Sequence, residues 1–339
     1  MFYSIEQNGT WSKPPIVSDD GKADFSPQMK EIDGEIYVTW ENSNTTYFGG
    51  TTMQDMLHSQ DIYVAKLDKA QGIFVDVSQI TNNDKLNAAP FFADSTDGDV
   101  VVMYQTNTEN DPFGISGTNK LNAVSYDGIK CNSINTNIST TKPLLDMSAI
   151  VNNGELKVAY VVDNNGDLQS IENRNLYLSQ NGKITQITNS KSPTTSPKWM
   201  TIDNQVLLTY IQDGKINYVD GINNNKSETV LLLPSTVDKF EINYYNNQPI
   251  ISFLDTNNDG NHQITLSMYD RQNKIFLSPF AISNSENDVD QYLLLFNSSD
   301  IEFVYSQKHK GDDERVLYTT IEQDIFNMEY DISLDNVIK

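Results

Sequence analysis

A sequence motif, here called a phrase, recurs along this chain and limits the folds that the chain can adopt. Ser26–Asn44 reads "SPQMKEIDGEIYVTWENSN", which is a short alternating run, a tight Asp-Gly turn and a second run with an aromatic residue near its end. Similar phrases begin at residues 89, 147, 196, 240 and 291, at separations of roughly 45 to 63 residues. Self-similarity at such a period is typical of repeat proteins, in which each repeat is one supersecondary unit. The chain is therefore predicted to be an array of six such units.

Each phrase is followed by a second pair of short runs, which gives every unit four strands, a to d. In the first unit this pair is Asp61–Asp68 and Phe74–Thr81, and in the third an Asn-Gly dipeptide marks a hairpin between them. Strand b is almost continuously apolar ("IYVTW", "VVVMY", "VLLTY"), as expected for a strand buried on both faces. Repeated four-stranded antiparallel units without intervening helices predict an all-β fold, a β-propeller, rather than tandem sandwiches or a solenoid.

The predicted blades are consecutive segments of one domain, residues 1–339. They span residues 24–84, 85–140, 141–190, 191–236, 237–288 and 289–339. The opening segment Phe2–Ser18 reads as a c–d hairpin around Asn8-Gly9, and its "YSIEQ" matches "YTTIEQ" in strand c of the sixth unit. Residues 1–23 are therefore predicted to be half a blade. Six complete units and this half favour a seven-bladed ring; the alternative is a six-bladed ring that the opening hairpin closes.

Charge and composition exclude several classes of function. The chain has 46 acidic and 23 basic residues and a net charge of −23, which repels phosphate backbones and anionic lipids. No apolar run approaches the roughly 18 residues that a membrane span requires, and no signal peptide is recognisable. We therefore expect neither a nucleic-acid partner nor membrane insertion. The single cysteine, Cys131, has no partner for an intrachain disulfide and is interpreted as structural.

Loop lengths predict which face of the propeller is functional. The a–b connections are minimal, whereas the long connections run from strand b to strand c, at Glu41–Gln60 and Gln105–Asn119. In a propeller the b–c and d–a loops share one face, and loops on a rigid scaffold commonly carry binding residues. Within the first loop, Thr52 and Asp55 are spaced as a capping box and predict a short helix over Met53–Ser59. The candidate ligand-binding residues in these two loops are Tyr47, Phe48, Glu109, Asp111 and Phe113.

Oxygen-bearing side chains at alternate positions suggest calcium loops. The clearest is "DTNNDGN", because oxygen ligands at i, i+2 and i+4 followed by glycine let one loop wrap around Ca²⁺. Leu266 stands where an EF-hand has its final glutamate, so Gln263, carbonyls or water would have to complete the shell. The same residue types also fill ordinary exposed turns. The predicted ligands are Asp255, Asn257 and Asp259 in unit five and Asp163, Asn165 and Asp167 in unit three, with Asn107, Glu109 and Asp111 at the same spacing in unit two.

Other catalytic or metal chemistry has weaker support. All three histidines, His58, His262 and His309, fall in predicted b–c loops, but no close ligand pair supports a shared transition-metal site. No Ser-His or Cys-His motif indicates a nucleophile. A glycosidase needs two carboxylates at a suitable separation, and the sequence singles out no pair among its 46 acids.

The opening "SIEQNGTW" is similar to the Asp-box turn of sialidases, with Glu6 or Asn8 in place of the aspartate. Sialidases of that kind bind the substrate carboxylate with three arginines, which suits the bidentate donors of guanidinium groups. The three arginines of this chain stand at the starts of two c strands and in a c–d turn on the opposite face. They are Arg174, Arg315 and Arg271. Sialidase activity is therefore not expected.

As a set, the units resemble the propeller repeats of large secreted or cell-surface proteins of Gram-positive bacteria. The text that carries this resemblance is "DGKADFSPQMKEIDGEIYVTWENSN", "DIYVAKLD", "NTENDPFGISGTNKL" and "VAYVVDNNGDLQSIENRNLYL". The similarity covers essentially the whole chain and is specific for the type of repeat rather than for an activity. It implies an extracellular module that is flanked by other domains, with no established catalytic residues to transfer to this sequence.

We therefore expect a non-catalytic extracellular module for binding or adhesion, stabilised by calcium. It would recognise a glycan or a surface protein on the face that carries the b–c and d–a loops. The alternative is a polysaccharide-active glycoside hydrolase or lyase that uses carboxylates at the propeller pore. Two carboxylates about 5 to 9 Å apart in a sugar-sized cleft would favour that alternative.

Overall fold

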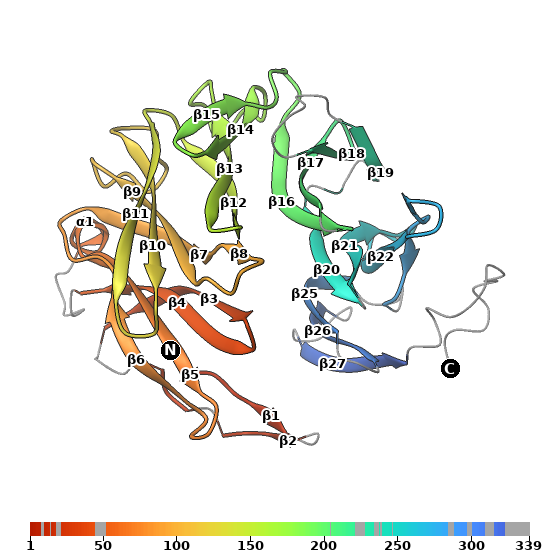
Figure 1. Ribbon diagram of the computed structural model, residues 1–339, viewed down its shortest axis with the longest axis horizontal. Helices are drawn as coiled ribbons and strands as arrows, with labels where there is room; N and C mark the ends of the chain where they lie inside the picture. The colour runs from red at the N-terminus through yellow and green to blue at the C-terminus, as the bar shows by residue number, and fades with distance from the viewer. Residues whose placement is uncertain are drawn as a thin grey trace. The chain divides into compact units, whose positions relative to one another are not determined.

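The computed structural model describes residues 1–7, 10–13, 15–17, 22–44, 52–203, 205–220, 228–233, 237, 239–245, 247–283, 288–296, 300–308 and 315–322. The chain falls into two compact units, residues 1–199 and residues 200–339. Its sheets are antiparallel meanders except for one short parallel pairing (Figure 1). Within the described residues, no helix is long and apolar enough to cross a membrane.

Each of the first three blades has four strands in chain order, and the short strand β8 (Asp94–Ser95) adds a fifth to the sheet of blade 3. Blade 1 contains β3 (Asp24–Ile32), β4 (Glu35–Ser43), β5 (Gln60–Asp68) and β6 (Ile73–Gln79), with α1 (Met53–His58) between β4 and β5. Blade 2 contains β7 (Leu86–Phe92), β9 (Val101–Asn107), β10 (Asn119–Tyr126) and β11 (Cys131–Thr140). Blade 3 contains β12 (Leu144–Asn152), β13 (Glu155–Asp163), β14 (Arg174–Gln180) and β15 (Lys183–Gln186).

Three more sheets follow along the chain. Blade 4 contains β16 (Thr194–Ile202), β17 (Gln205–Gln212), β18 (Lys215–Asp220) and β19 (Glu228–Leu232). Blade 5 contains β20 (Glu241–Tyr245), β21 (Gln248–Thr256), β22 (His262–Asp270), β23 (Ile275–Phe276) and β24 (Phe280–Ala281). The last sheet has three strands, β25 (Asp288–Phe296), β26 (Asp300–Lys308) and β27 (Arg315–Glu322).

The blade count corrects the sequence prediction. Six complete units in a seven-bladed or six-bladed ring were expected, whereas the described residues make five blades of four or more strands. The sixth sheet has only strands a, b and c, because the segment that would supply strand d falls in residues 323–339, outside the described part of the chain. The opening segment is a hairpin, as predicted, with β1 (Glu6–Gln7) paired to β2 (Thr10–Trp11) and a bridge between Phe2 and Ile16.

The a–b connection of blade 2 also differs from the minimal turn that its Asp-Gly dipeptide predicted. Between β7 and β9 the chain forms β8 (Asp94–Ser95), which pairs in parallel with β12 of blade 3. The Thr96 N–H extends this pairing by donating to the Val151 carbonyl at 3.0 Å. The carboxylate of Asp94 forms an ion pair with Lys30 of blade 1. This connection therefore ties three consecutive blades together.

Local signals elsewhere in the sequence are confirmed. The Thr52 hydroxyl accepts from the Asp55 N–H, and the Asp55 carboxylate accepts from the Thr52 N–H, so the capping box begins α1. The Asn-Gly turn between β14 and β15 has positive φ at both residues, 52° at Asn181 and 71° at Gly182. That conformation matches the twist of a two-residue hairpin and favours asparagine followed by glycine.

In three of the blades, a hydroxyl side chain at the same position after strand d bonds to the backbone of strand c. The texts "ITN", "ITN" and "ISN" come directly after strand d in blades 1, 3 and 5, and the central residue of each accepts a hydrogen bond from the first apolar residue of strand c. The pairs are Thr81 with Ile62 at 2.9 Å, Thr188 with Leu176 at 2.8 Å and Ser283 with Ile264 at 2.8 Å. Each bond satisfies a buried backbone donor that would otherwise reduce stability.

The cores of the first unit lie between successive blades. Blades 1 and 2 bury a cluster that includes Ile62, Val102 and Tyr126, and Cys131 packs against it. Burial raises the pKa of the Cys131 thiol, in keeping with its structural interpretation. Strand b is buried on both faces as predicted, for example along β13.

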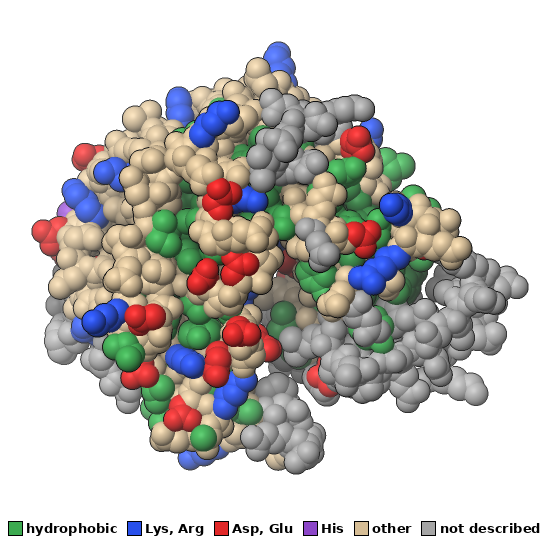
Figure 2. Space-filling model, viewed as in Figure 1, with side chains coloured by type: hydrophobic (Ala, Val, Ile, Leu, Met, Phe, Trp, Pro, Cys, Tyr) green, Lys and Arg blue, Asp and Glu red, His purple; other side chains and the backbone are tan. Residues whose placement is uncertain are grey.

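On the face of this unit in Figure 2, lysine and arginine side chains stand apart among acidic ones and form no basic stripe.

Candidate ligand-binding site

The long loop of blade 2 is closed by two asparagines, one the last residue of β9 and the other the first residue of β10. Asn107 and Asn119 face each other in the sheet, and the Asn107 side chain donates to the Asn119 Oδ1 at 2.8 Å. The Asn107 Oδ1 also accepts from the backbone N–H groups of Glu109 and Asp111, both at 2.9 Å. Asn119 donates to the Gly114 carbonyl at 2.7 Å. Both asparagines are buried, so this loop has a fixed polar base.

Asp111 organises the tip of the same loop. Its Oδ1 accepts from the Phe113 N–H at 2.9 Å, and its Oδ2 accepts from the N–H groups of Ile115 at 2.9 Å and Ser116 at 2.7 Å. Burial alone would raise the pKa of Asp111, but these hydrogen bonds together hold the pKa below its usual value. Asp111 is therefore an ionised internal support for the loop.

The loop is also anchored to the d–a connection that joins β6 of blade 1 to β7 of its own blade. The Asn110 side chain accepts from the Leu86 N–H at 2.5 Å and donates to the Asp84 carbonyl at 3.2 Å. Asn110 has a φ of 57°, a left-handed conformation that asparagine tolerates better than most residues. At Gly114, an added Cβ would lie 2.8 Å from the Asn119 Oδ1, so a side chain there would displace the base of the loop.

The anchored loop holds Phe113 at the mouth of a cavity. The Phe113 side chain is 66% exposed, and the cavity beneath it has a volume of about 120 Å³. The apolar part of its lining comes from residues near the start of β7 and from the first residue of β12. The polar part includes side-chain amides. The lining residues are Leu86, Ala88, Ala89, Gln105, Asn107, Asp111, Pro112, Phe113, Gly114, Asn119 and Leu144. This arrangement combines an exposed aromatic face, side-chain amides and a small apolar recess.

The structure brings together only some of the predicted ligand-binding residues. Asp111 and Phe113 both line the cavity. Glu109 does not: it is exposed and packs beside Gly117, where an added Cβ would lie 2.6 Å from the Glu109 Cγ. Tyr47 and Phe48 fall outside the described residues. The sequence analysis missed the amides and the apolar floor, although the asparagines that bracket the b–c loop could have indicated its base.

A buried carboxyl group lies directly behind the cavity wall. The Glu41 Oε1 accepts from the N–H of Ala89, a lining residue, at 2.7 Å, and its other oxygen accepts from the Gln60 amide. The side chain is only 6% exposed, and burial raises the pKa of the carboxyl. Asp61 is similarly buried, and burial likewise raises its pKa. Because the oxygens of Glu41 are occupied by protein donors, this group supports the wall of the cavity.

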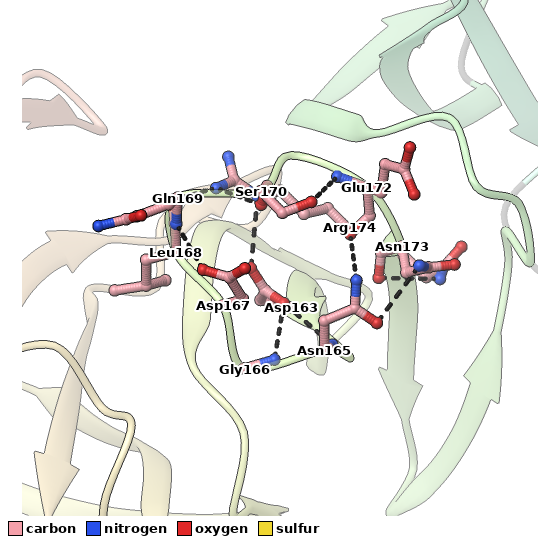
Figure 3. A network of polar contacts seen from close by, with 11 residues as sticks. Asp163, Asn165, Gly166, Asp167, Leu168, Gln169, Ser170, Glu172, Asn173 and Arg174 are labelled. Carbon is pink, nitrogen blue, oxygen red and sulfur yellow. Dashed lines mark hydrogen bonds and ion pairs between the residues drawn. The ribbon is translucent and has the colours of Figure 1, made fainter.

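The predicted calcium loop of blade 3 contains a guanidinium group (Figure 3). Asp163 is 0% exposed; its Oδ1 accepts from the N–H groups of Asn165 at 3.0 Å and Gly166 at 2.9 Å. Its Oδ2 lies 3.6 Å from the Arg174 Nε, and Arg174 also donates to the carbonyls of Leu168 and Ser170. A cation already neutralises the buried aspartate, so the donor set of this loop does not fit Ca²⁺.

The predicted loop of blade 5 has a different arrangement. The Asn257 Oδ1 accepts from the N–H groups of Asp259 at 2.9 Å and Asn261 at 3.0 Å and so shapes the turn. Asp255 is half-buried at the end of β21 and stands opposite Gln263 in β22, whereas Asp259 is exposed. Within the described residues, neither aspartate forms an ion pair with a cation of the protein. Oxygen ligands of this kind suit Ca²⁺.

The histidines form separate local contacts. His58 lies at the end of α1 beside the Gln54 side chain at 2.8 Å, and His262 lies 2.7 Å from the Asp288 carboxylate. His309 is outside the described residues. Within the described part of the chain, no group of three or more His, Cys, Asp or Glu residues is placed to hold a metal ion.

Comparison with known proteins identifies the fold. No model of a protein family and no curated protein matches the chain. Among solved structures, it is similar to a Hadza microbial sialidase, Hz136, with a TM-score of 0.54 and 13% identity over 96% of this chain and 69% of that one. It is also similar to the polysaccharide lyase Uly1, with a TM-score of 0.53 and 9% identity over 88% of this chain and 77% of that one.

A third similarity is to the sialidase of Trypanosoma rangeli, with a TM-score of 0.50 and 12% identity. The match covers 92% of this chain but only 56% of the length of that sialidase. Identities this low establish architecture alone. Together with the antiparallel four-stranded sheets, they show that the chain is a β-propeller, as its repeats predicted.

Proposed function

We propose that the chain is an extracellular binding module, of the kind found in Gram-positive cell-surface proteins, that recognises a glycan at Phe113 and the cavity beneath it. The observation that carries the proposal is an exposed aromatic ring that a rigid loop holds over side-chain amides. An aromatic face supplies a large apolar contact area at little conformational-entropy cost, because its loop is already ordered.

The chemistry of the site suits a neutral sugar chain. A pyranose ring has apolar C–H faces that stack on an aromatic ring and hydroxyls that bind an amide such as that of Gln105, whereas the Asn107 amide is already bonded within the loop. The cavity of about 120 Å³ is smaller than most small-molecule pockets, which are about 300–1,000 Å³, so one substituent would enter it while the ring rests on Phe113. The net charge of −23 disfavours anionic ligands. The similar sialidases and polysaccharide lyase are named for action on carbohydrates, which supports the same ligand class.

A polysaccharide-active enzyme is the second candidate, and the raised pKa of the Glu41 carboxyl is the observation that favours it, because general acids often have such a pKa. The hydrogen bonds of the carboxylates at this site favour a binding function over catalysis. The oxygens of Glu41 and Asp111 are occupied by donors of the protein, which leaves no free carboxylate pair in the described lining of this cavity. Glycoside hydrolysis requires such a pair.

Replacing Phe113 with alanine is expected to weaken glycan binding about tenfold, which corresponds to about 1.4 kcal/mol of lost stacking. Binding is screened on an array of neutral and acidic glycans, and affinity for the best ligand is then measured by calorimetry. Ile129→Ala is the matched control, because Ile129 is also an exposed apolar residue, 75% exposed, in the c–d turn of blade 2. Unchanged affinity in Phe113→Ala would refute Phe113 as the binding site. Binding only to a surface protein would refute a glycan as the ligand. Release of soluble sugars would establish that the chain is a polysaccharide-active enzyme.

We also propose that Asp255 and Asp259, with backbone carbonyls and water, bind calcium and stabilise blade 5. Calcium at 100 times its dissociation constant is expected to stabilise the protein by about 2.7 kcal/mol. Thermal unfolding is followed in calcium and in EGTA, with the variant Asp255→Asn/Asp259→Asn as the test of location. Equal midpoints in both buffers would contradict calcium binding, and a calcium-dependent midpoint in the double variant would place the ion elsewhere.

A further inference from the structure

A second and larger cavity lies between blades 2 and 3, at the side of the turns that join strands a to b and c to d. Its volume is about 330 Å³, within the range of about 300–1,000 Å³ that is usual for small-molecule sites. Leu156 and Val158 of β13 provide an apolar wall. Asn135, Asn137, Glu155 and Asn181 provide polar groups. None of the residues that line it belongs to the Phe113 site.

A bulge in the outer strand of blade 2 builds one side of this cavity. Leu121 pairs with Ile138 and Ala123 pairs with Ile134, so residues 135–137 bulge opposite the single residue Asn122. Asn137 has a φ of 57°, in the left-handed region, and the Ser179 hydroxyl donates to the Thr136 carbonyl at 3.2 Å from blade 3. Bulges of this kind re-aim side chains and are common next to functional sites.

The corresponding space between blades 1 and 2 is filled. There the Tyr126 side chain is 3% exposed, and its hydroxyl donates to the carbonyl of Asp76, the left-handed residue in the bulge of β6. Tyr126 is five residues beyond Leu121 in strand c. Five residues beyond Leu176, the equivalent position in blade 3, the strand has already ended and Asn181 begins the turn. The cavity therefore exists because blade 3 has a small residue in a turn where blade 2 has a buried tyrosine.

The polar groups of the cavity have capacity for a ligand. The exposed Asn137 amide makes no hydrogen bond to another described residue, and its Nδ2 lies over Gly182, where an added Cβ would be 2.8 Å away. The Glu155 carboxylate accepts from the amides of Gln180, at 2.8 Å, and Asn181, which leaves each oxygen a second lone pair. No lysine or arginine lines the cavity, so it offers no counter-charge for an anion.

We propose that this cavity binds one neutral sugar residue. A hydroxylated ring has an apolar C–H face for Leu156 and Val158 and hydroxyls that both donate to the Glu155 carboxylate and accept from the Asn137 amide. A phosphate, carboxylate or sulfate ester would approach Glu155 with no lysine or arginine in the lining to offset the repulsion and is disfavoured. The proposal is independent of the Phe113 site, because the two cavities share no lining residue.

The test titrates the chain with glucose, galactose, mannose, N-acetylglucosamine and, as the anionic probe, glucuronate, while amide NMR signals are followed. At least one neutral sugar is expected to shift the signals of Asn137, Gly154, Asn181 and Gly182, and glucuronate is not. Asn137→Gly, which retains the left-handed conformation, is expected to weaken that binding about fivefold, and Asn137→Asp should weaken it as well. Phe113→Ala should leave it unchanged.

Three results would overturn the proposal. The first is that none of the neutral sugars shifts these signals in the wild-type chain. The second is that glucuronate binds as tightly as the best neutral sugar, which would remove the charge argument. The third is that Asn137→Gly, with an unchanged spectrum elsewhere, binds that sugar with wild-type affinity.

Discussion

Replacing Arg174 with methionine is expected to lower the free energy of unfolding by about 3 to 5 kcal/mol. The reason is the burial of its partner: the Asp163 side chain is 0% exposed, and Arg174 is the only cation of the described residues that pairs with it. Loss of the guanidinium leaves a buried carboxylate with two backbone donors and no counter-charge, and the carbonyls of Leu168 and Ser170 also lose their donor. Urea unfolding followed by fluorescence measures the change.

Two further variants test whether the loss of stability comes from the buried ion pair. Arg271→Met removes a guanidinium that also donates to a backbone carbonyl, that of Asn247 at 2.9 Å, but in an exposed turn, so it should change stability by less than about 0.5 kcal/mol. Asp163→Asn/Arg174→Met removes both charges and should be more stable than Arg174→Met alone. If Arg174→Met unfolds at the wild-type urea concentration, the pair contributes nothing and the loop is held by its backbone turns.

The role of Asp163 could not be predicted from the sequence. The alternation of Asp163, Asn165 and Asp167 is the same in a calcium loop and in a turn that the side chains cap through backbone N–H groups. The residue that decides between them, Arg174, is eleven positions away and was assigned only to the start of a strand. The spacing of residues shows which metal ligands a loop contains. The direction in which each side chain points depends on the strands on either side of the loop.

The architecture was more predictable than the sites. The blades, the Asn181-Gly182 turn and the capped helix all rest on local periodicity or on backbone conformations that few residue types tolerate. By contrast, the parallel pairing of β8 depends on contacts with two other blades, and the cavity at Asn137 depends on a register shift in β11. Neither has a local signal, because both result from how neighbouring sheets fit together.

Replacing Asp111 with asparagine is expected to weaken glycan binding about tenfold, as much as the loss of the Phe113 ring itself. Asparagine keeps the size of the side chain but cannot accept on both sides, so the N–H groups on one oxygen lose a charged acceptor worth at least about 1.5 kcal/mol. The loop tip then no longer holds Phe113 over the cavity, and the stacking contribution of about 1.4 kcal/mol to binding is lost. Calorimetry measures affinity, and hydrogen exchange at residues 113–116 reports the loosened loop.

The control for this prediction is Asp127→Asn. Asp127 also accepts from two backbone N–H groups, those of Ile129 at 2.9 Å and Lys130 at 2.7 Å, and hydrogen bonds likewise lower its pKa, but it lies in the c–d turn of blade 2. It should leave binding unchanged. Wild-type affinity in Asp111→Asn, with faster exchange at residues 113–116, would show that the loop order is irrelevant to the ligand.

The pH dependence of binding tests the same support without a mutation. Because hydrogen bonds hold the folded-state pKa of Asp111 below its unfolded value, the carboxylate stabilises the loop at any pH above that unfolded value, about 3.9. The contribution is lost as the pH falls through the lower, folded-state pKa. Affinity in the wild type is therefore expected to stay constant from pH 7 to about 5 and to decline only below about 4, whereas Asp111→Asn should remain weak throughout. A wild-type decline already complete at pH 5 would assign the dependence to a group other than Asp111.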